Sequence, residues 1–402
     1  MTTLALLFIA APVACGVYAY ALYPLVLRAL AARRPAVQLA SDPDTWPLIT
    51  ISIPAYNEQA AIREAIESVL AADYPADRRQ LLILSDASSD GTDAIVGEYA
   101  ARGVELFRLA ARGGKTAAEN AAAVAMRGDI VVNTDASIRI LPHSLKALVR
   151  AFSDATVGVA SGRDISVGEA SEANRSESTY VGYEMWVRQL ETRLGSIVGA
   201  SGCLYAYRRP LHDPTLPVEM TRDFAAPMQA RALGLRSVSI DDAVCIVPRT
   251  KTLRAELRRK ARTMGQGLQT LWYQRSLMNP ARYGGFALML VSHKLARWLV
   301  YPAGVLAIVG LVILAPEHAA ARWLLVLGAL GAFTGTLALR WPSDRTPPFA
   351  LALAGYALST ALAGVLAWAR LLRRQRVATW EPTRRDTASA SAGSGSPPAT
   401  PK

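Results

Sequence analysis

Residues 48–93 place an amphipathic segment between two apolar runs, and this order restricts the fold more than any other stretch. The first run, Leu48–Ile53, is rich in β-branched residues and ends at Pro54, which indicates a buried strand. The next segment repeats apolar residues at the spacing of one helical face: Ile62, Ala65, Ile66, Val69 and Leu70. The second run, Leu81–Leu84, ends in a polar loop. Strand, helix and strand predict a parallel βαβ unit and an α/β fold.

Polar side chains follow both predicted strands. Asn57 and Glu58 come after the first strand, and Asp86 and Asp90 come after the second. Open parallel sheets bind ligands at the carboxyl ends of their strands, so these residues are expected to face one crevice. Carboxylates there suit ribose hydroxyls, base edges or a cation, and suit bare phosphate poorly. The alternative is that Asp86 and Asp90 only cap the following helix.

The loop sequences PAYNE (Pro54–Glu58) and SDASSDGT (Ser85–Thr92) resemble the start of the family 2 glycosyltransferases. The chain resembles the membrane-embedded members of the hyaluronan, poly-N-acetylglucosamine and cellulose synthase type. The resemblance implies a GT-A fold, inverting sugar transfer, and a UDP-sugar whose uracil and ribose lie in these loops. It assigns donor contacts to Pro54, Tyr56, Asn57, Glu58 and Asp86. The family's second loop reads Asp-Asp-Gly-Ser-Thr-Asp, from which Ser85 and Ala87 depart.

A glycine pair, Gly113-Gly114, precedes Lys115 at the start of an alanine-rich segment that is predicted to be helical, Thr116–Met126. Glycine lets the backbone approach a ligand closely, and a lysine there adds to the positive helix end. The sequence contains no G-x-G-x-x-G or G-x-x-x-x-G-K-[ST] pattern, which disfavours dinucleotide folds and P-loops. The resemblance assigns nucleotide binding to Lys115; the alternative is an ordinary surface turn.

Residues 128–137 form a further strand that ends in an acidic turn at Asp135. A carboxylate at this position can bind Mg²⁺ or Mn²⁺, and the cation can stabilise a leaving diphosphate. Asp135 matches the first Asp of the family's D-x-D motif, which makes it a donor and metal residue, but Ser137 replaces the second. The alternative is a helix cap before Pro142.

The small-residue stretch Ser196–Tyr207 matches the family's acceptor side and contains Gly199, Ser201 and Gly202. It lacks the G-x-S-x-G spacing of a serine hydrolase. Asp223 aligns with the general base of the family's Thr-Glu-Asp motif, with Arg222 in place of Glu. Such an Arg would lower the pKa of the base unless it points away. The alternative is that Asp223 is an N-cap.

Apolar residues recur three or four positions apart along Leu253–Leu271, with basic residues between them, which predicts an amphipathic helix at the headgroups of the membrane. The family's Q-x-x-R-W motif falls here, and only Arg262 is retained, since Thr263 replaces Trp. Arg262 is therefore a candidate contact of the leaving diphosphate or a residue that closes the acceptor channel, and a purely membrane-surface role for the basic cluster is the alternative.

The chain is 51% hydrophobic and 19% charged, with its apolar residues concentrated towards both ends. Leu4–Leu27 is long enough to span a bilayer, and the absence of basic residues before it disfavours a signal peptide. Three more spans are predicted at Leu299–Ala315, Ala321–Leu339 and Phe349–Ala369. The division is an anchor with a basic flank (1–34), a GT-A domain (46–250), interfacial helices (251–298), spans (299–370) and a basic, then disordered tail (371–402).

The basic residues flank the apolar spans, at Arg28, Arg33 and Arg34 and again at Arg370–Arg376. The net charge of +12 therefore indicates contact with anionic lipid headgroups and agreement with the positive-inside rule, and it does not indicate nucleic-acid binding. Four crossings would, however, separate the two basic flanks. Either the segment Phe286–Trp298 contributes another crossing or one apolar run does not cross. Cys15, Cys203 and Cys245 show neither disulfide nor metal spacing.

The sequence therefore predicts a multi-pass protein of the plasma (inner) membrane with a cytoplasmic catalytic domain. It would transfer a sugar from a nucleotide sugar, a UDP-sugar by resemblance, to a growing polysaccharide or a lipid acceptor with inversion. Transfer of a single sugar to a lipid and a non-catalytic membrane scaffold are the alternatives. Mg²⁺ or Mn²⁺, membrane lipids and a possible partner subunit are the expected associates.

Overall fold

The computed structural model describes residues 1–35, 41–167, 172–213, 215–248, 253–342 and 347–375. For residues 166–167 and 172–180 it describes the backbone alone. Residues 376–402, which include most of the predicted disordered tail, lie outside the described part of the chain, as do residues 249–250 at the end of the predicted catalytic domain.

The predicted βαβ unit is confirmed and extends into an eight-stranded sheet in the order β3-β2-β1-β4-β7-β6-β8-β5. The first four strands are parallel: β1 (Ile49–Ala55), β2 (Arg79–Ser85), β3 (Val104–Arg108) and β4 (Ile130–Thr134). β7 (Leu204–Arg208) is antiparallel to both β4 and β6 (Val157–Val167), and β8 (Arg236–Pro248) is parallel to β6. The short strand β5 (Arg139–Ile140) pairs antiparallel with β8.

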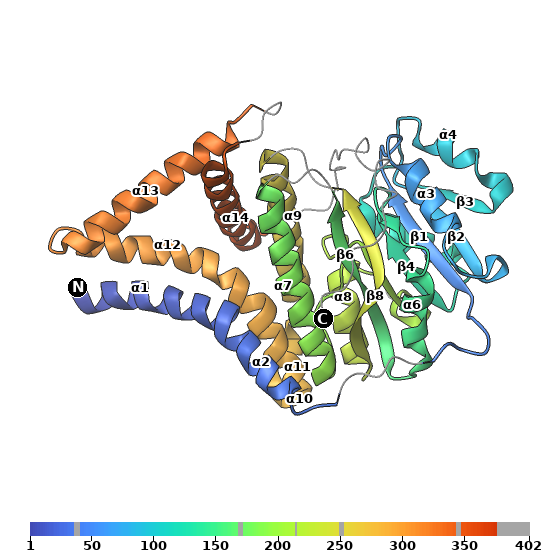
Figure 1. Ribbon diagram of the computed structural model, residues 1–402, viewed down its shortest axis with the longest axis horizontal. Coiled ribbons are helices and arrows are strands. Elements are labelled where there is room, and N and C mark those ends of the chain that lie inside the picture. Colours follow the sequence, from blue (N-terminus) through green and yellow to red (C-terminus); the bar gives the residue numbers. More distant parts are fainter. Residues whose placement is uncertain (36–40, 168–171, 214, 249–252, 343–346, 376–402) are drawn as a thin grey trace.

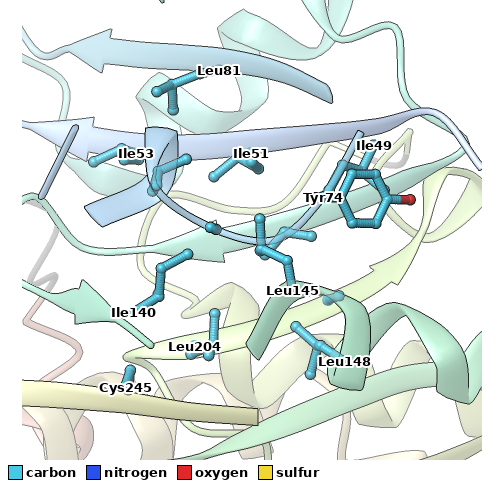
Figure 2. Packing of buried hydrophobic residues seen from close by; sticks show 14 of the residues in the cluster. Ile49, Ile51, Ile53, Tyr74, Leu81, Ile140, Leu145, Leu148, Leu204 and Cys245 are labelled. Carbon is cyan, nitrogen blue, oxygen red and sulfur yellow. The ribbon is translucent and has the colours of Figure 1, made fainter. Parts of the chain in front are cut away.

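Helices cover both faces of the sheet (Figure 1). The helices of this domain are α3 (Ile62–Leu70), α4 (Thr92–Gly97), α5 (Lys115–Ala121), α6 (Ser144–Arg150), α7 (Glu172–Leu194) and α8 (Arg222–Ala232). Ile49, Ile51 and Ile53 are fully buried and pack in one cluster with residues of α3 and α6 (Figure 2). The opposite face forms a second cluster with residues of α5 and α8. Each such isoleucine contributes about 1.5–3 kcal/mol by leaving water, so β1 anchors the domain.

Four helices are long and apolar enough to cross a membrane. The first, residues 2–31, combines α1 (Thr2–Val17), a π-helical turn and α2 (Tyr23–Ala31). The second, residues 285–314, combines α11 (Gly285–Leu290), the π-helical turn η8 (Val291–Leu295) and α12 (Ala296–Leu314). The others are α13 (Ala319–Leu339) and α14 (Phe349–Leu372).

The second apolar helix differs from the sequence-based division at residues 298 and 299. We expected an interfacial segment, Phe286–Trp298, followed by a separate span, but the chain is helical from Gly285 to Leu314. No strong helix breaker separates the two segments, and η8 accommodates the change within the helix. Its charged residues lie against α7 of the catalytic domain, as described below.

α1 and α12 lie side by side and extend away from the sheet (Figure 1). They approach so closely that a Cβ atom added to Gly310 would lie 2.6 Å from the carbonyl oxygen of Ala5. α9 (Leu253–Tyr273) connects the catalytic domain with this helical part, and α14 packs along it. α10 (Pro280–Tyr283) follows α9.

We predict that Gly310→Leu destabilises the protein because the larger side chain must push α1 away from α12. Overpacking of this kind typically costs about 1–3 kcal/mol. The matched control is Gly304→Leu on the same helix, where an added Cβ meets nothing within 4 Å. Thermal unfolding in detergent should begin at a lower temperature for the first variant only. Equal unfolding temperatures would mean that α1 does not pack on α12 in this way.

Candidate active site

Asn57 connects the loops that follow β1 and β2. Its backbone has a φ of 52°, its side-chain oxygen accepts a hydrogen bond from the Ser89 amide at 2.8 Å, and its own amide donates to the Ser88 hydroxyl at 3.2 Å. The Glu58 amide donates to the Thr92 hydroxyl at 2.8 Å. Asn57 and Glu58 thus hold the two loops together at the carboxyl edge of the sheet. Pro54 lies inside β1, opposite Leu84.

Asp86 and Asp90 have different roles in this structure. Asp90 accepts hydrogen bonds from the amide of Thr92 at 3.0 Å and of Gln59 at 3.2 Å, so it fixes the start of α4. Asp86 instead accepts from the amides of Gly113 and Gly114, at 2.7 and 2.8 Å. Neither residue is the N-cap of α4, which is Gly91: Asp90 contacts the start of the helix from the preceding position, whereas Asp86 joins the end of β2 to the glycine loop.

Arg112 covers the ring of Tyr56, with its guanidinium carbon 3.9 Å from the ring centroid. This geometry is a cation–π contact. The family resemblance assigns Tyr56 to the donor and says nothing of Arg112. Its place directly before the Gly-Gly-Lys run is the only signal that the sequence offers for it.

Lys115 and Asp135 form an ion pair, with 2.7 Å between Nζ and Oδ1. About a quarter of each side chain is exposed, so a ligand can reach both. Burial by itself would lower the pKa of Lys115, but the carboxylates of Asp135, Glu119 and Asp223 outweigh it and raise this pKa above its ordinary value. The side chains from α5, from the turn after β4 and from α8 therefore share one electrostatic environment.

Arg222 turns into the protein and packs against α5. Its side chain is 1% exposed, and its guanidinium donates to Asn120 at 2.8 Å and lies 3.4 Å from the carboxylate of Glu119. Burial raises the pKa of Glu119, and the positive charges of Lys115 and Arg222 oppose this rise. Arg222 thus pairs with a buried carboxylate that the sequence analysis missed, although Glu119 lies one helical turn after Lys115.

Asp223 lies in the first turn of α8 beside the acceptor-side glycines. The N-cap of α8 is Thr221, so the N-cap alternative for Asp223 does not hold. A Cβ atom added to Gly202 would lie 3.1 Å from Asp223 Oδ2, and the carbonyl of Asp223 accepts a hydrogen bond from the Ala200 amide. Glycine at 202 therefore leaves room directly in front of the carboxylate.

The other two acceptor-side residues have protein partners. The Ser201 hydroxyl donates to Asp164 at 2.5 Å and accepts from the Cys203 amide at 3.1 Å. A Cβ atom added to Gly199 would lie 3.2 Å from both Cε of Lys294 and the ring of Phe224. Lys294 comes from η8, so the second apolar helix reaches the acceptor side of the site. In the sequence, the only sign that Lys294 belongs to a site is its charge within an apolar segment.

The charged residues of η8 and α12 meet the carboxylates of α7. Glu184 lies 3.2 Å from Lys294 Nζ, 2.8 Å from Arg297 Nη1 and 2.9 Å from His293 Nε2. His293 Nδ1 lies 2.6 Å from Glu191, and the Tyr23 hydroxyl of α2 donates to the same carboxylate at 2.7 Å. These contacts fix the apolar helices to the catalytic domain beside the acceptor side.

Arg262 lies on α9, outside the sheet edge that carries Asp86 and Asp135. The same helix contacts the site further along, where the Thr270 hydroxyl accepts a hydrogen bond from the Thr221 amide at 3.1 Å. α9 therefore touches the chain two residues before Asp223.

Within the described residues, no group of three His, Cys, Asp or Glu side chains is arranged to hold a metal ion. Asp135 offers one carboxylate, and its neighbour two residues on is Ser137. Mg²⁺ sites commonly use one or two carboxylates and complete their shell with substrate phosphates and water. The donor set therefore fits a cation shared with a diphosphate and does not fit an all-protein cage.

Residues 50–215 match the family model described as glycosyl transferase family 2. These residues form a family 2 glycosyltransferase domain. Over 206 residues the chain is 31% identical to a hyaluronan synthase of Streptococcus pyogenes, covering 48% of this chain and 46% of that protein. Over 181 residues it is 30% identical to an N-acetylglucosaminyltransferase of Mesorhizobium japonicum, covering 41% and 40%. The chain thus spans less than half the length of these curated relatives.

The fold extends beyond the family 2 domain. A mannosyltransferase from Pyrobaculum calidifontis, PcManGT, in complex with GDP-Man and Mn²⁺, superposes with a TM-score of 0.73. The superposition covers 93% of this chain and 99% of that one at 21% sequence identity. This likeness confirms the predicted GT-A fold, and the apolar helices fit the predicted membrane association.

We predict that Gly114→Ala weakens nucleotide binding because Gly114 has φ 91° and ψ 167°, a conformation that only glycine adopts readily. Strain of this kind costs about 1–3 kcal/mol and would displace the amides that hold Asp86. The control is Gly97→Ala in α4, where an added Cβ meets nothing within 4 Å. Calorimetric titration with UDP should show weaker binding for Gly114→Ala alone; unchanged affinity would separate this loop from the nucleotide.

Proposed function

We propose that this protein is an integral-membrane, inverting glycosyltransferase that uses a nucleotide sugar, a UDP-sugar, as donor. The observation that carries the proposal is the convergence of Lys115 from α5, Asp135 from the turn after β4 and Asp223 from α8 at one partly exposed place. Diphosphate binding requires a positively charged side chain and a carboxylate at the end of a strand. Proton removal requires a second carboxylate, here beside a glycine.

The nucleotide lies across the loops after β1 and β2. Tyr56 and Arg112 offer a flat surface on which the nucleotide base can stack. Asp86 and the glycine loop lie at the edge of that base. Lys115 binds the diphosphate after exchanging its contact with Asp135. Asp135 would hold Mg²⁺ or Mn²⁺ beside the diphosphate, and this cation would supply positive charge that stabilises the leaving group.

Asp223 is the general base of the proposed transfer. The acceptor hydroxyl oxygen bonds to the anomeric carbon on the face opposite the diphosphate, the bond from that carbon to the diphosphate oxygen breaks, and Asp223 takes the hydroxyl proton. Since Arg222 turns to Glu119 and Asn120, the carboxylate is not paired with its neighbour in sequence. This orientation supports catalysis over a scaffold that has lost activity.

The acceptor is a growing polysaccharide or a lipid that arrives at the membrane surface. The contact of Lys294 with the position of Gly199 supports this assignment, because it brings an apolar helix to the acceptor side. With the basic residues Arg28, Arg33 and Arg34 on the cytosolic face, the catalytic domain lies in the cytoplasm at the inner membrane. Arg262 on α9 is proposed to contact the diphosphate as it leaves.

We predict that Asp223→Asn lowers sugar transfer by about 10²–10⁴, the usual worth of general-base assistance, and leaves UDP affinity unchanged. The amide keeps the size of the side chain but cannot accept the proton. Asp242→Asn, which changes an exposed carboxylate of β8, serves as the control and should keep normal transfer. Transfer from a panel of UDP-sugars, measured as nucleotide release, provides the readout. Normal turnover of Asp223→Asn would exclude it as the base.

We also predict that EDTA removes tight UDP binding and that Asp135→Asn removes the effect of added Mn²⁺ on it. Calorimetry measures both without requiring turnover. Asp129→Asn at the opposite end of β4 is the matched control, because its side chain is exposed and lies away from the site. Ser137→Asp should tighten the apparent affinity for Mn²⁺ by supplying a second carboxylate. Cation-independent UDP binding by the unaltered protein would remove Asp135 from the metal role.

A further inference from the structure

The two basic flanks of the apolar helices conflict if all four helices cross the membrane. With Arg28, Arg33 and Arg34 on the side of the catalytic domain, four crossings would place Arg370, Arg373 and Arg374 on the opposite side. That arrangement contradicts the positive-inside rule. For both basic flanks to lie on one side, one of the four candidate helices must not cross the membrane.

α14 follows α9 along its length, and both run in the same direction. Near its start, a Cβ atom added to Gly355 would lie 2.7 Å from a methyl group of Leu253. Further along, Lys260 Nζ donates to the Thr360 hydroxyl at 2.7 Å. At the far end, the Gln269 side chain donates to the carbonyl of Gln375 at 2.8 Å. Both ends of α14 are thus held at the level of α9.

α9 belongs to the catalytic side of the molecule. It follows β8 in the chain, and its Thr270 contacts Thr221 next to the candidate active site. It carries the basic residues Arg254, Arg258, Arg259, Lys260 and Arg262. A helix with this many charges cannot lie across the hydrocarbon core without a large cost, so it marks the level of the headgroups.

The parts of α13 and α12 that α9 and α14 contact also lie on this side. Arg254 of α9 donates to the carbonyl of Leu339 at the end of α13. Trp368 of α14 donates to the carbonyl of Trp298, just after the residues of α12 that meet α7. The opposite end of the helices is formed by Ala5, Leu314 and Ala321, which pack together without α14.

We propose that α14 does not cross the bilayer but lies beside α9 in the leaflet that faces the catalytic domain. The chain then crosses with three of its four candidate helices: residues 2–31, residues 285–314 and α13. Both basic flanks lie on one side. The exposed leucines of α14, Leu353, Leu362 and Leu366, enter the acyl chains of that leaflet, and Arg254 and Arg258 of α9 meet its anionic headgroups.

Cysteine accessibility tests this topology in the complete protein. Three variants leave every arginine in place: Ala32→Cys after α2, Glu317→Cys between α12 and α13, and Gln375→Cys after α14, all at exposed positions. Each is treated with a membrane-impermeant maleimide in right-side-out and inverted vesicles, with the unaltered protein as background for Cys15, Cys203 and Cys245. We expect Gln375→Cys to react from the same side as Ala32→Cys and from the side opposite to Glu317→Cys.

An export-dependent phosphatase gives a second readout that does not depend on thiol reactivity. Fused after Lys402 in a bacterial host it should be inactive, and inserted after Glu317 in the otherwise complete chain it should be active. Labelling of Gln375→Cys from the side of Glu317→Cys, or an active fusion at Lys402, would overturn the proposal. Because neither readout involves sugar transfer, their failure is distinguishable from failure of the proposed function.

Discussion

The register of three parallel strands determines where the candidate site can form. In the pairing of β1 with β2, Ala55 lies opposite Ser85, so the chain leaves both strands at the same level and Asn57 meets Ser89. In the pairing of β1 with β4, Ser52 lies opposite Asn133, which brings Asp135 to the level of Pro54. A shift by one residue would move the isoleucines of β1 to the opposite face of the sheet and place Thr50 and Ser52 in their cluster with α3 and α6, so the core fixes this register. Core packing and site geometry thus have the same cause.

The sequence predicted those parts of the molecule that follow from local pattern. The βαβ unit and the apolar helices follow from periodicity and composition, and the GT-A fold follows from the resemblance of motifs within single loops to a known family. The partners of Arg222 could not be predicted, because Glu119 meets it only when α5 packs against α8. Arg112 and Lys294 were missed for the same reason. Both act through contacts with residues distant in sequence, Tyr56 and Glu184.

The membrane helices and the catalytic domain are joined by buried charges. Lys294, Arg297 and His293 all reach Glu184, whose side chain is 12% exposed. Charges removed from water require partners, and loss of one partner from such a group costs about 3–5 kcal/mol. The junction therefore sets the distance between the bilayer and the acceptor side of the site. The sequence contains these charges within an apolar segment but gives no indication that α7 neutralises them.

The central claim is that the donor nucleotide lies at the carboxyl ends of β1, β2 and β4. Photolabelling with a 5-azido-UDP-sugar in the presence of Mn²⁺, followed by peptide mapping of the complete protein in lipid, tests it most directly. We expect the label within residues 54–58 or 110–116, with protection by excess UDP. A UDP-protected label confined to other parts of the chain would contradict the account.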